Sequence, residues 1–277
     1  MGIVLPADDN WPKKLNDLGK KAPKQLWYEG EWEAKLFEKC ACVVGSRRMT
    51  EYGRRVIEKL VPKLVDSGWT IVSGMMYGMD QAAHKMCLEC GGKTIGVLGW
   101  GIKYKSLSDE DIKLIKQVID GGGLVISEWE EQAGTLWTFP MRDRIMAALA
   151  TDIYVVEAAV KSGALITADW GIKLHRQIWA VPGPITSRVS EGTNWLVAQG
   201  LAKIWVPSAK ASEDQDPRYI NHTEVCILLQ NEALTVDDIA RKTGRTVADL
   251  GAELTMMILK EEVEEKEGKY YLLSGQA

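Results

Sequence analysis

The sequence predicts an α/β fold with a mostly parallel sheet and helices on both of its faces, followed by a small C-terminal domain. Two observations predict the sheet. Short apolar runs alternate with helical patterns between about residues 40 and 206, and this alternation is typical of right-handed βαβ crossovers. Runs such as residues 153–156 are also apolar almost throughout, as expected for strands that are buried on both faces.

The core is expected to span residues 38–206. Its strands are predicted at residues 40–45, 69–73, 94–98, 124–127, 153–156 and 177–181, with a weaker one at 202–206. Its helices are predicted at residues 52–67, 78–90, 108–120, 142–149, 164–175 and 192–199. Each predicted helix lies between two predicted strands, which is the order that a parallel sheet requires.

A lead-in at residues 1–37 precedes the core. Pro6, Pro12 and Pro23 interrupt it, so we expect an irregular segment that packs on the core through its aromatic and leucine side chains. A linker is predicted at residues 207–218, because this stretch is polar and shows no periodicity.

Residues 219–277 are expected to form a winged helix. Helices are predicted at 221–229, after an N-cap at Thr235, and at 246–260, and short strands at 263–267 and 270–273 meet at Gly268 and Lys269. The third helix carries a cation only at Lys260, whereas a DNA recognition helix normally presents several basic or amide side chains. We therefore expect this domain to contact the core or a protein.

Charge is distributed unevenly along the chain. Residues 219–277 contain six Lys and Arg against eleven Asp and Glu, so residues 1–218 carry +1 of the total charge of −4. An anionic ligand would therefore bind at a local patch on the core. No apolar run is long enough to span a membrane and no signal peptide is visible, which predicts a cytoplasmic protein that does not bind membranes.

The cysteines do not predict a metal site. Cys87 and Cys90 have the CxxC spacing that zinc sites and redox motifs use. They fall within a predicted helix, and the chain has only three His to complete a ligand set. We expect free thiols, no metal and no cofactor.

Glycine-rich loops follow several of the predicted strands. In an open parallel sheet these loops meet beyond the carboxyl ends of the strands, where ligands bind, and glycine lets the backbone approach a phosphate. A phosphate-binding edge is therefore predicted at Gly45, Ser46, Arg47, Arg48, Ser73, Gly74, Gly78, Lys161, Ser162 and Gly163. No Lys and Ser/Thr follow the second glycine as in a Walker loop, so nucleoside triphosphate hydrolysis is not expected.

Two further groups of residues lie near these loops. Asp80 and His84 are spaced to share one helix face, either as an acid–base pair or, as we favour, as structural support for the loop. Glu157, at a strand tip, is expected to hold a neighbouring loop. Of Arg142 and Arg144, one is expected to pair internally with Asp143 and the other to point outward, while Phe139 is either a base-stacking platform or a core residue.

These motifs together resemble the DNA-processing protein A (DprA/Smf) family. The resemblance rests on Gly45–Arg48, on the Ser73-Gly74-x3-Gly78-x-Asp80-x3-His84 spacing, on Phe139-Pro-x-Arg142-x-Arg144 and on Ser162-Gly163-x-Leu-Ile-Thr-Ala. It extends over nearly the whole chain, from Trp11 to the predicted winged helix.

The resemblance implies an extended Rossmann-like fold, usually dimeric, that binds single-stranded DNA without accepted enzymatic activity. Such proteins protect incoming strands during natural transformation and help to load the RecA recombinase in DNA recombination. Carried over by motif, Arg47 contacts the phosphate backbone, the other loop residues and Arg142 line the pocket, and Phe139 meets a base. Lys161 and Arg144 are expected to add charge.

This chain departs from the family at three points. Met75 and Met76 stand where the family usually has Leu-Ala, and Asp143 replaces the asparagine of an Arg-Asn-Arg motif. A lysine that often precedes the phenylalanine is absent, and Trp137 lies on that approach. These departures bear on affinity more than on the class of ligand.

Two alternatives come from other classes of protein. A nucleotide or nucleoside-phosphate hydrolase on a related fold would use paired carboxylates, which are missing after Glu157. A dinucleotide-dependent oxidoreductase would carry Gly-x-Gly-x-x-Gly after the first strand, which is also missing. Single-strand binding remains the favoured hypothesis.

Overall fold

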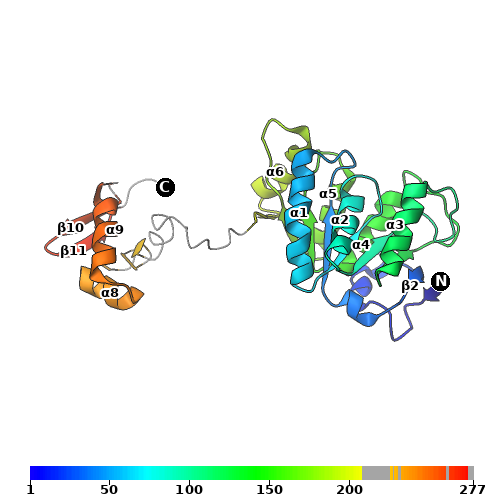
Figure 1. Cartoon of the computed structure of the whole chain (residues 1–277), viewed down its shortest axis with the longest axis horizontal. Helices are drawn as coiled ribbons and strands as arrows, with labels where there is room; N and C mark the ends of the chain where they lie inside the picture. The colour runs from blue at the N-terminus through cyan, green and yellow to red at the C-terminus, as the bar shows by residue number, and fades with distance from the viewer. Residues whose placement is uncertain (208–224, 227, 230–231, 260–261, 274–277) are drawn as a thin grey trace. The chain divides into compact units, whose positions relative to one another are not determined.

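The computed structural model of the protein describes residues 1–207, 225–226, 228–229, 232–259 and 262–273. The chain divides into two compact units, Met1–Pro207 and Ser208–Ala277 (Figure 1). Each unit is described by itself. The predicted linker at 207–218 lies outside the described residues except for Pro207.

The large unit is built on one sheet of nine strands in the order β1-β2-β6-β5-β4-β3-β7-β8-β9. The pairs from β6 through β5, β4, β3, β7 and β8 to β9 are all parallel. The strands are β1 (Gly2–Val4), β2 (Leu26–Gly30), β3 (Cys40–Val44), β4 (Thr70–Ser73), β5 (Thr94–Val97), β6 (Leu124–Ser127), β7 (Asp152–Val155), β8 (Gln177–Ala180) and β9 (Lys203–Ile204). The predicted Rossmann-like α/β fold is confirmed.

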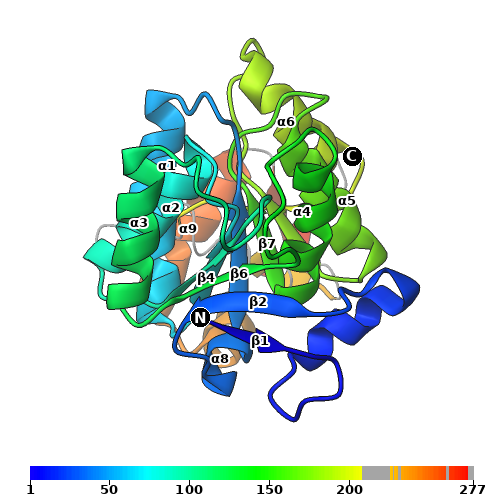
Figure 2. The ribbon, with the colours of Figure 1, turned by 90° about the vertical axis from the view of Figure 1, so that its right-hand side faces the viewer.

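Helices cover both faces of the sheet, and Figure 2 shows α1, α2 and α3 on one side and α4, α5 and α6 on the other. They are α1 (Glu51–Asp66), α2 (Met79–Glu89), α3 (Asp109–Asp120), α4 (Thr138–Leu149), α5 (Gly163–Lys173) and α6 (Glu191–Ala198). Alternate residues of β3 serve the two cores: Ala41 and Val43 pack with α1, and Cys42 packs on the opposite side. This alternation follows from the two-residue period of a strand.

The order of the strands reverses at β3, whose neighbours are β4 on one side and β7 on the other. From β3 the chain runs outward through β4, β5 and β6, and then returns to β7. The loops that leave β3 and β7 therefore diverge, and a crevice opens between them at the carboxyl ends of the strands. This is the place where open α/β sheets bind ligands.

The expectation that the lead-in is irregular is wrong. β1 pairs antiparallel with β2, and β2 pairs antiparallel with β6, so the lead-in extends the sheet at one edge. Between these strands lies a 3-10 helix, η1 (Lys13–Lys21), which packs against α4. Two further short 3-10 helices are η2 (Ala34–Phe37) and η3 (Arg188–Ser190).

The C-terminal unit contains α8 (Val236–Thr243), α9 (Val247–Leu259) and a hairpin of β10 (Val263–Lys266) and β11 (Lys269–Leu272). Thr235 caps α8 in a capping box with Asp238, as its position before the helix predicts. Most of the helix expected at 221–229 lies outside the described residues, although Val225 and Leu229 are buried in this unit's core. The winged-helix assignment stays a prediction.

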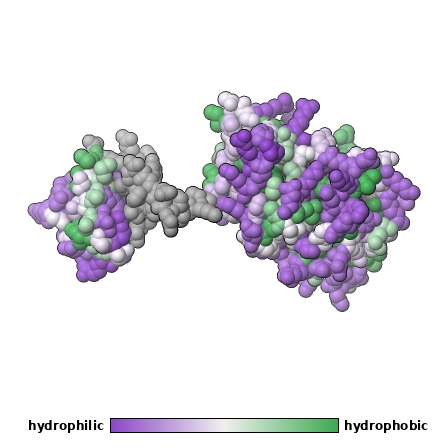
Figure 3. All heavy atoms as spheres, viewed as in Figure 1, coloured by the Kyte–Doolittle hydropathy of each residue, from purple (hydrophilic) through white to green (hydrophobic). Residues whose placement is uncertain are grey.

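The outer surface of the large unit is mostly polar where helices face away from the sheet. Figure 3 shows mainly hydrophilic side chains over α1 and α3, as expected for helices whose apolar stripe faces a core. Among the described helices, none is both long and apolar enough to cross a bilayer.

Candidate nucleic-acid site

A cavity of about 630 Å³ opens at the point where the order of the strands reverses. The loops after β3, β4 and β7 and the first turns of α4 and α5 surround it. Of the residues predicted from the sequence, it is lined by Gly45, Ser46, Arg47, Arg48, Asp80, Phe139, Arg142, Ser162 and Gly163. The structure therefore brings together residues from four separate motifs.

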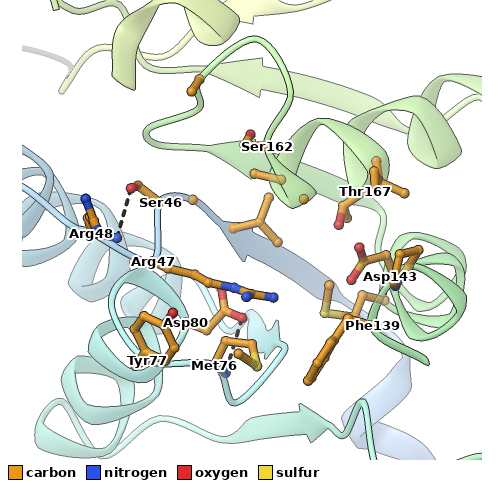
Figure 4. Close-up of a pocket in the computed structure, with 18 of the residues that line it drawn as sticks. Ser46, Arg47, Arg48, Met76, Tyr77, Asp80, Phe139, Asp143, Ser162 and Thr167 are labelled. Atoms are coloured by element: carbon orange, nitrogen blue, oxygen red, sulfur yellow. Dashed lines mark hydrogen bonds between the residues drawn. The ribbon is translucent and has the colours of Figure 1, made fainter. Parts of the chain in front are cut away.

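Arg47 reaches across the cavity from the loop after β3 (Figure 4). Its guanidinium carbon lies 5.8 Å from the ring centroid of Tyr77 and 5.3 Å from that of Phe139, which are cation–π distances. The side chain is exposed, and none of the ion pairs in the described part of the chain includes it. Arg47 is thus positioned by aromatic rings while its hydrogen-bond donors stay available to a ligand.

The floor of the cavity is a buried group of charged side chains, Arg142, Asp143 and Asp80. Arg142 is only 3% exposed and donates to the carbonyl oxygen of Val97 and, over 3.2 Å, to Oδ1 of Asp143. Gly74 makes room for it, since a Cβ at that position would collide with the Arg142 guanidinium. Asp80 accepts a hydrogen bond from the backbone N–H of Met76.

Burial shifts the titration of both floor carboxyls. Desolvation raises the pKa of Asp143 to about 6, although the neighbouring positive charge of Arg142 opposes the rise. Desolvation also raises the pKa of Asp80, again opposed by Arg142. The positive charge of Arg47 lowers the pKa of both carboxyls. The exposed arginine and the buried carboxyls therefore interact electrostatically across the cavity.

The two glycine loops pack closely against each other. Gly78 has φ of +84°, and a Cβ there would meet the carbonyl oxygen of Arg47. Gly45 lies against the side chain of Met79, whose backbone N–H donates to the carbonyl oxygen of Ser46 over 3.2 Å. Ser73, Gly74 and Gly78 do not line the cavity; they set the path of the loop that carries Tyr77 and Asp80.

The opposite wall is the start of α5. Ser162 is its N-cap, yet the Ser162 hydroxyl makes no capping bond and is a buried polar atom without a hydrogen-bond partner among the described residues. The next residue, Gly163, is exposed, and a Cβ built on it would meet nothing within 4 Å. A helix N-terminus offers backbone N–H groups and a positive dipole end to an anion, and here a hydroxyl without a partner lies beside them.

The residues predicted to support the pocket have structural partners. Glu157 is buried and accepts hydrogen bonds from the backbone N–H and the hydroxyl of Thr50, the N-cap of α1. His84 is buried and pairs through Nδ1 with the Thr94 hydroxyl at 2.7 Å, while desolvation lowers its pKa to about 3. No hydrogen bond joins His84 to Asp80 among the described residues, so the geometry does not form the acid–base pair considered above.

Two predicted cations lie outside the cavity. The expectation that one arginine of α4 points outward is wrong, because Arg144 is 4% exposed and forms a bidentate pair with Glu128 at 2.6 and 2.8 Å. Its Nε also donates to the carbonyl oxygen of Lys21. Lys161 is exposed on the loop before α5 but is not among the lining residues.

Several residues of the lining were not among the predicted site residues, including Tyr77, Leu136, Thr167 and Arg188. Tyr77 is an exposed aromatic within a glycine loop, a signal that was available. Arg188 is an exposed cation on η3, beyond the carboxyl end of β8. Trp137, on the approach where the family's lysine is absent, packs edge-on against Trp129 with ring centroids 5.9 Å apart, and it does not line the cavity.

The cysteines lie where the helix prediction placed them. Cys87 is buried in α2, and its thiol donates to the carbonyl oxygen of Lys93, while Cys90 caps the helix and is exposed. Within the described ranges no group of three His, Cys, Asp or Glu could hold a metal ion.

Comparison with known proteins extends the resemblance seen in the sequence. A family model described as DNA recombination-mediator protein A matches residues 2–214. Protein Smf of Escherichia coli K12 is 32% identical over 271 residues, covering 91% of this chain and 72% of that protein. The DNA processing protein DprA of Streptococcus pneumoniae is 36% identical over 194 residues, covering 70% of this chain and 67% of that protein.

Two solved structures share the fold of the large unit. The X-ray structure of DprA from Streptococcus pneumoniae matches with a TM-score of 0.67 and 34% identity, covering 75% of this chain and 71% of that one. A structure of DprA from Helicobacter pylori, described for its single-stranded DNA binding mode, matches with a TM-score of 0.64 and 26% identity. It covers 74% of this chain and 91% of that one.

Proposed function

The chain belongs to the DNA recombination-mediator protein A family, and from that premise we propose that it binds single-stranded DNA in the cavity around Arg47. The Helicobacter pylori relative is described as binding single-stranded DNA. The cavity of this chain has the parts that such a ligand needs, namely a cation, a helix N-terminus and aromatic rings, of which Tyr77 is exposed and Phe139 is half-buried.

The observation that carries the proposal is the placement of Arg47. Its exposed guanidinium lies between Tyr77 and Phe139 over a buried floor that is already internally paired. Arg47 therefore supplies forked donors to a phosphate, while the two rings offer faces to the adjoining bases. Base stacking tolerates every sequence, so binding without sequence preference is expected.

The wall formed by α5 supports a second phosphate contact. Within the described part of the chain, the Ser162 hydroxyl has no hydrogen-bond partner, and Gly163 leaves open space where a side chain would stand. A phosphate oxygen at this position accepts from the hydroxyl and from the first N–H groups of the helix. Arg48 and Arg188, both exposed and both lining the cavity, add positive charge at its rim.

We propose that the protein acts by binding and not by catalysis. Both carboxyls of the floor lie beside Arg142, and Glu157 accepts a hydrogen bond from Thr50. The carboxylates near the ligand therefore have structural roles. Protection of incoming strands during natural transformation, loading of the RecA recombinase and assembly into a homodimer are carried over from the family resemblance as parts of the same proposal. In this proposal the buried Arg142 and Arg144 act on the ligand indirectly. Lys161, which is exposed beside the cavity, acts at the margin of the ligand.

Titration of labelled oligonucleotides tests the proposal. The full chain is titrated with single-stranded and duplex DNA at low and moderate salt, alongside the Arg47→Ala variant. We expect tighter binding to the single strand, with log affinity falling by about 0.7 for each phosphate contact per decade of salt. Arg47→Ala should lose at least about tenfold in affinity, as removal of a charge-assisted contact implies.

Arg55→Ala is the matched control. Arg55 is also an exposed arginine, but it lies on α1, pairs with Glu51 and does not line the cavity. Its replacement should leave binding unchanged. Equal losses in the two variants would indicate a diffuse electrostatic effect and contradict the site, and an absence of binding to either oligonucleotide would contradict the proposed ligand.

A further inference from the structure

A second cavity of about 760 Å³ adjoins the Arg47 cavity on the same unit. It lies between the end of η1, the first turns of α4 and the outer side of α5. Pro140 and Ile166 line both cavities. These two residues therefore form the boundary between the two hollows, and an extended polymer that leaves the first cavity over Pro140 and Ile166 reaches the second.

The second cavity is strongly basic. Lys20, Lys21 and Lys24 line it, and all three are exposed. The only other charged residues in its lining are Arg144 and Glu128, which neutralise each other in the bidentate pair. None of the ion pairs found among the described residues involves the three lysines. A surface of three uncompensated cations attracts a polyanion.

The lysines are held in place from beneath. Arg144 donates through Nε to the carbonyl oxygen of Lys21 over 2.9 Å and through its other nitrogens to Glu128 and to the carbonyl oxygen of Met141. This buried arginine thus fastens the end of η1 to α4. On the outer side, the ammonium of Lys21 lies 4.9 Å from the ring centroid of Trp170.

We propose that the second cavity is a further subsite for the same DNA strand, in which Lys20, Lys21 and Lys24 contact phosphates beyond those held at Arg47. The proposal rests on the proposed function, because the first cavity must hold the strand that continues here. Trp170 forms the apolar wall of the subsite, and Arg144 acts as a positioning residue that touches no DNA.

The length of the oligonucleotide separates the two subsites. Oligothymidylates of about 4 and about 16 nucleotides, which bracket common single-strand site sizes, are titrated with the full chain and with the variant Lys20→Gln/Lys21→Gln/Lys24→Gln. We expect the variant to bind the short oligonucleotide as the unaltered protein does. It should bind the long one roughly tenfold or more weakly, with a salt slope smaller by about 2.

A matched control removes three exposed lysines that line neither cavity, Lys35, Lys59 and Lys113, by the same change to glutamine. It should keep both affinities. The subsite is overturned if the Lys20→Gln/Lys21→Gln/Lys24→Gln variant binds the long oligonucleotide as tightly as the unaltered protein does. It is also overturned if this variant loses affinity equally for both lengths, or if the control variant loses as much affinity for the long oligonucleotide. Failure of the unaltered protein to bind either length would instead overturn the proposed function.

Discussion

The floor and the rim of the Arg47 cavity are both rich in charge, yet they are built in opposite ways. On the floor, Arg142 is 3% exposed and hydrogen-bonds to Asp143 and to the carbonyl oxygen of Val97. At the rim, Arg47 is exposed and lies against the rings of Tyr77 and Phe139. Two arginines of one site therefore have different tasks.

The difference indicates how such a site divides stability from binding. A buried arginine that satisfies buried carboxyls is part of the fold, and removing it leaves uncompensated charge. An exposed arginine without an ion pair contributes little to folding but keeps its donors for a ligand. Substitutions at the floor should therefore change the free energy of unfolding, and substitutions at the rim should change the affinity for the ligand.

Removal of the floor arginine is expected to have the largest effect. Arg142→Ala leaves the Asp80 and Asp143 carboxyls buried without their cation, which should lower the free energy of unfolding by about 3–5 kcal/mol. Denaturant unfolding of the large unit measures this. Arg48→Ala, at the rim, serves as the control and should change stability little; equal losses in both variants would remove the distinction between floor and rim.

Asp143→Asn should have an intermediate effect that depends on pH. Because burial raises the pKa of Asp143 to about 6, the folded state holds its proton more tightly than the unfolded state. The stabilising contribution is full below about pH 4 and disappears as pH rises through about 6, a loss of up to about 3 kcal/mol. Asparagine lacks the charge, so the variant should not show this slope.

Strand binding offers a second measurement of the same variant. Protonation of Asp143 removes a negative charge near Arg47, so the affinity of the unaltered protein for single-stranded DNA should rise as pH falls from about 7 to about 5. Asp143→Asn should show the higher affinity already at neutral pH, with a flatter profile. A steeper profile in the variant would place the titrating group elsewhere.

Gly163→Ala should have the smallest effect on folding, so a change in its affinity for single-stranded DNA reports on the rim alone. The added Cβ meets no atom of the protein within 4 Å, so the unfolding free energy should stay within about 0.5 kcal/mol. If a phosphate approaches the start of α5, the methyl group obstructs it and the affinity for single-stranded DNA falls. Unchanged affinity would show that the strand does not touch this wall.

The parallel core was predictable because each of its strands is a short apolar run between helices. β1 and β2 were missed for physical reasons. They are antiparallel strands at the edge of the sheet, β1 has only three residues, and β2 is mostly half-buried. Their pairing with each other and with β6 depends on contacts between distant parts of the chain, which local pattern does not reveal.

The loops that form the candidate site were predictable from the sequence, but the role of each side chain in the site was not. Gly45, Arg47, Ser162 and Gly163 do meet in one cavity, because parallel strands bring their carboxyl ends to one edge. The burial of Arg144 was not predictable, since its partners are Glu128 and the carbonyl oxygen of Lys21. Helical spacing indicates the face of a side chain, not the partner that a distant segment provides.

The antiparallel pairing of β2 with β6 has a consequence for the order of folding. β2 is made early in synthesis, but its hydrogen-bonding partner lies beyond α1, α2 and α3 in the chain. The N-terminal segment must therefore wait for most of the sheet to be synthesised before it can dock, and such long-range closure slows folding. Lys20, Lys21 and Lys24 belong to this segment, so the basic wall beside α4 is assembled late in the maturation of the molecule.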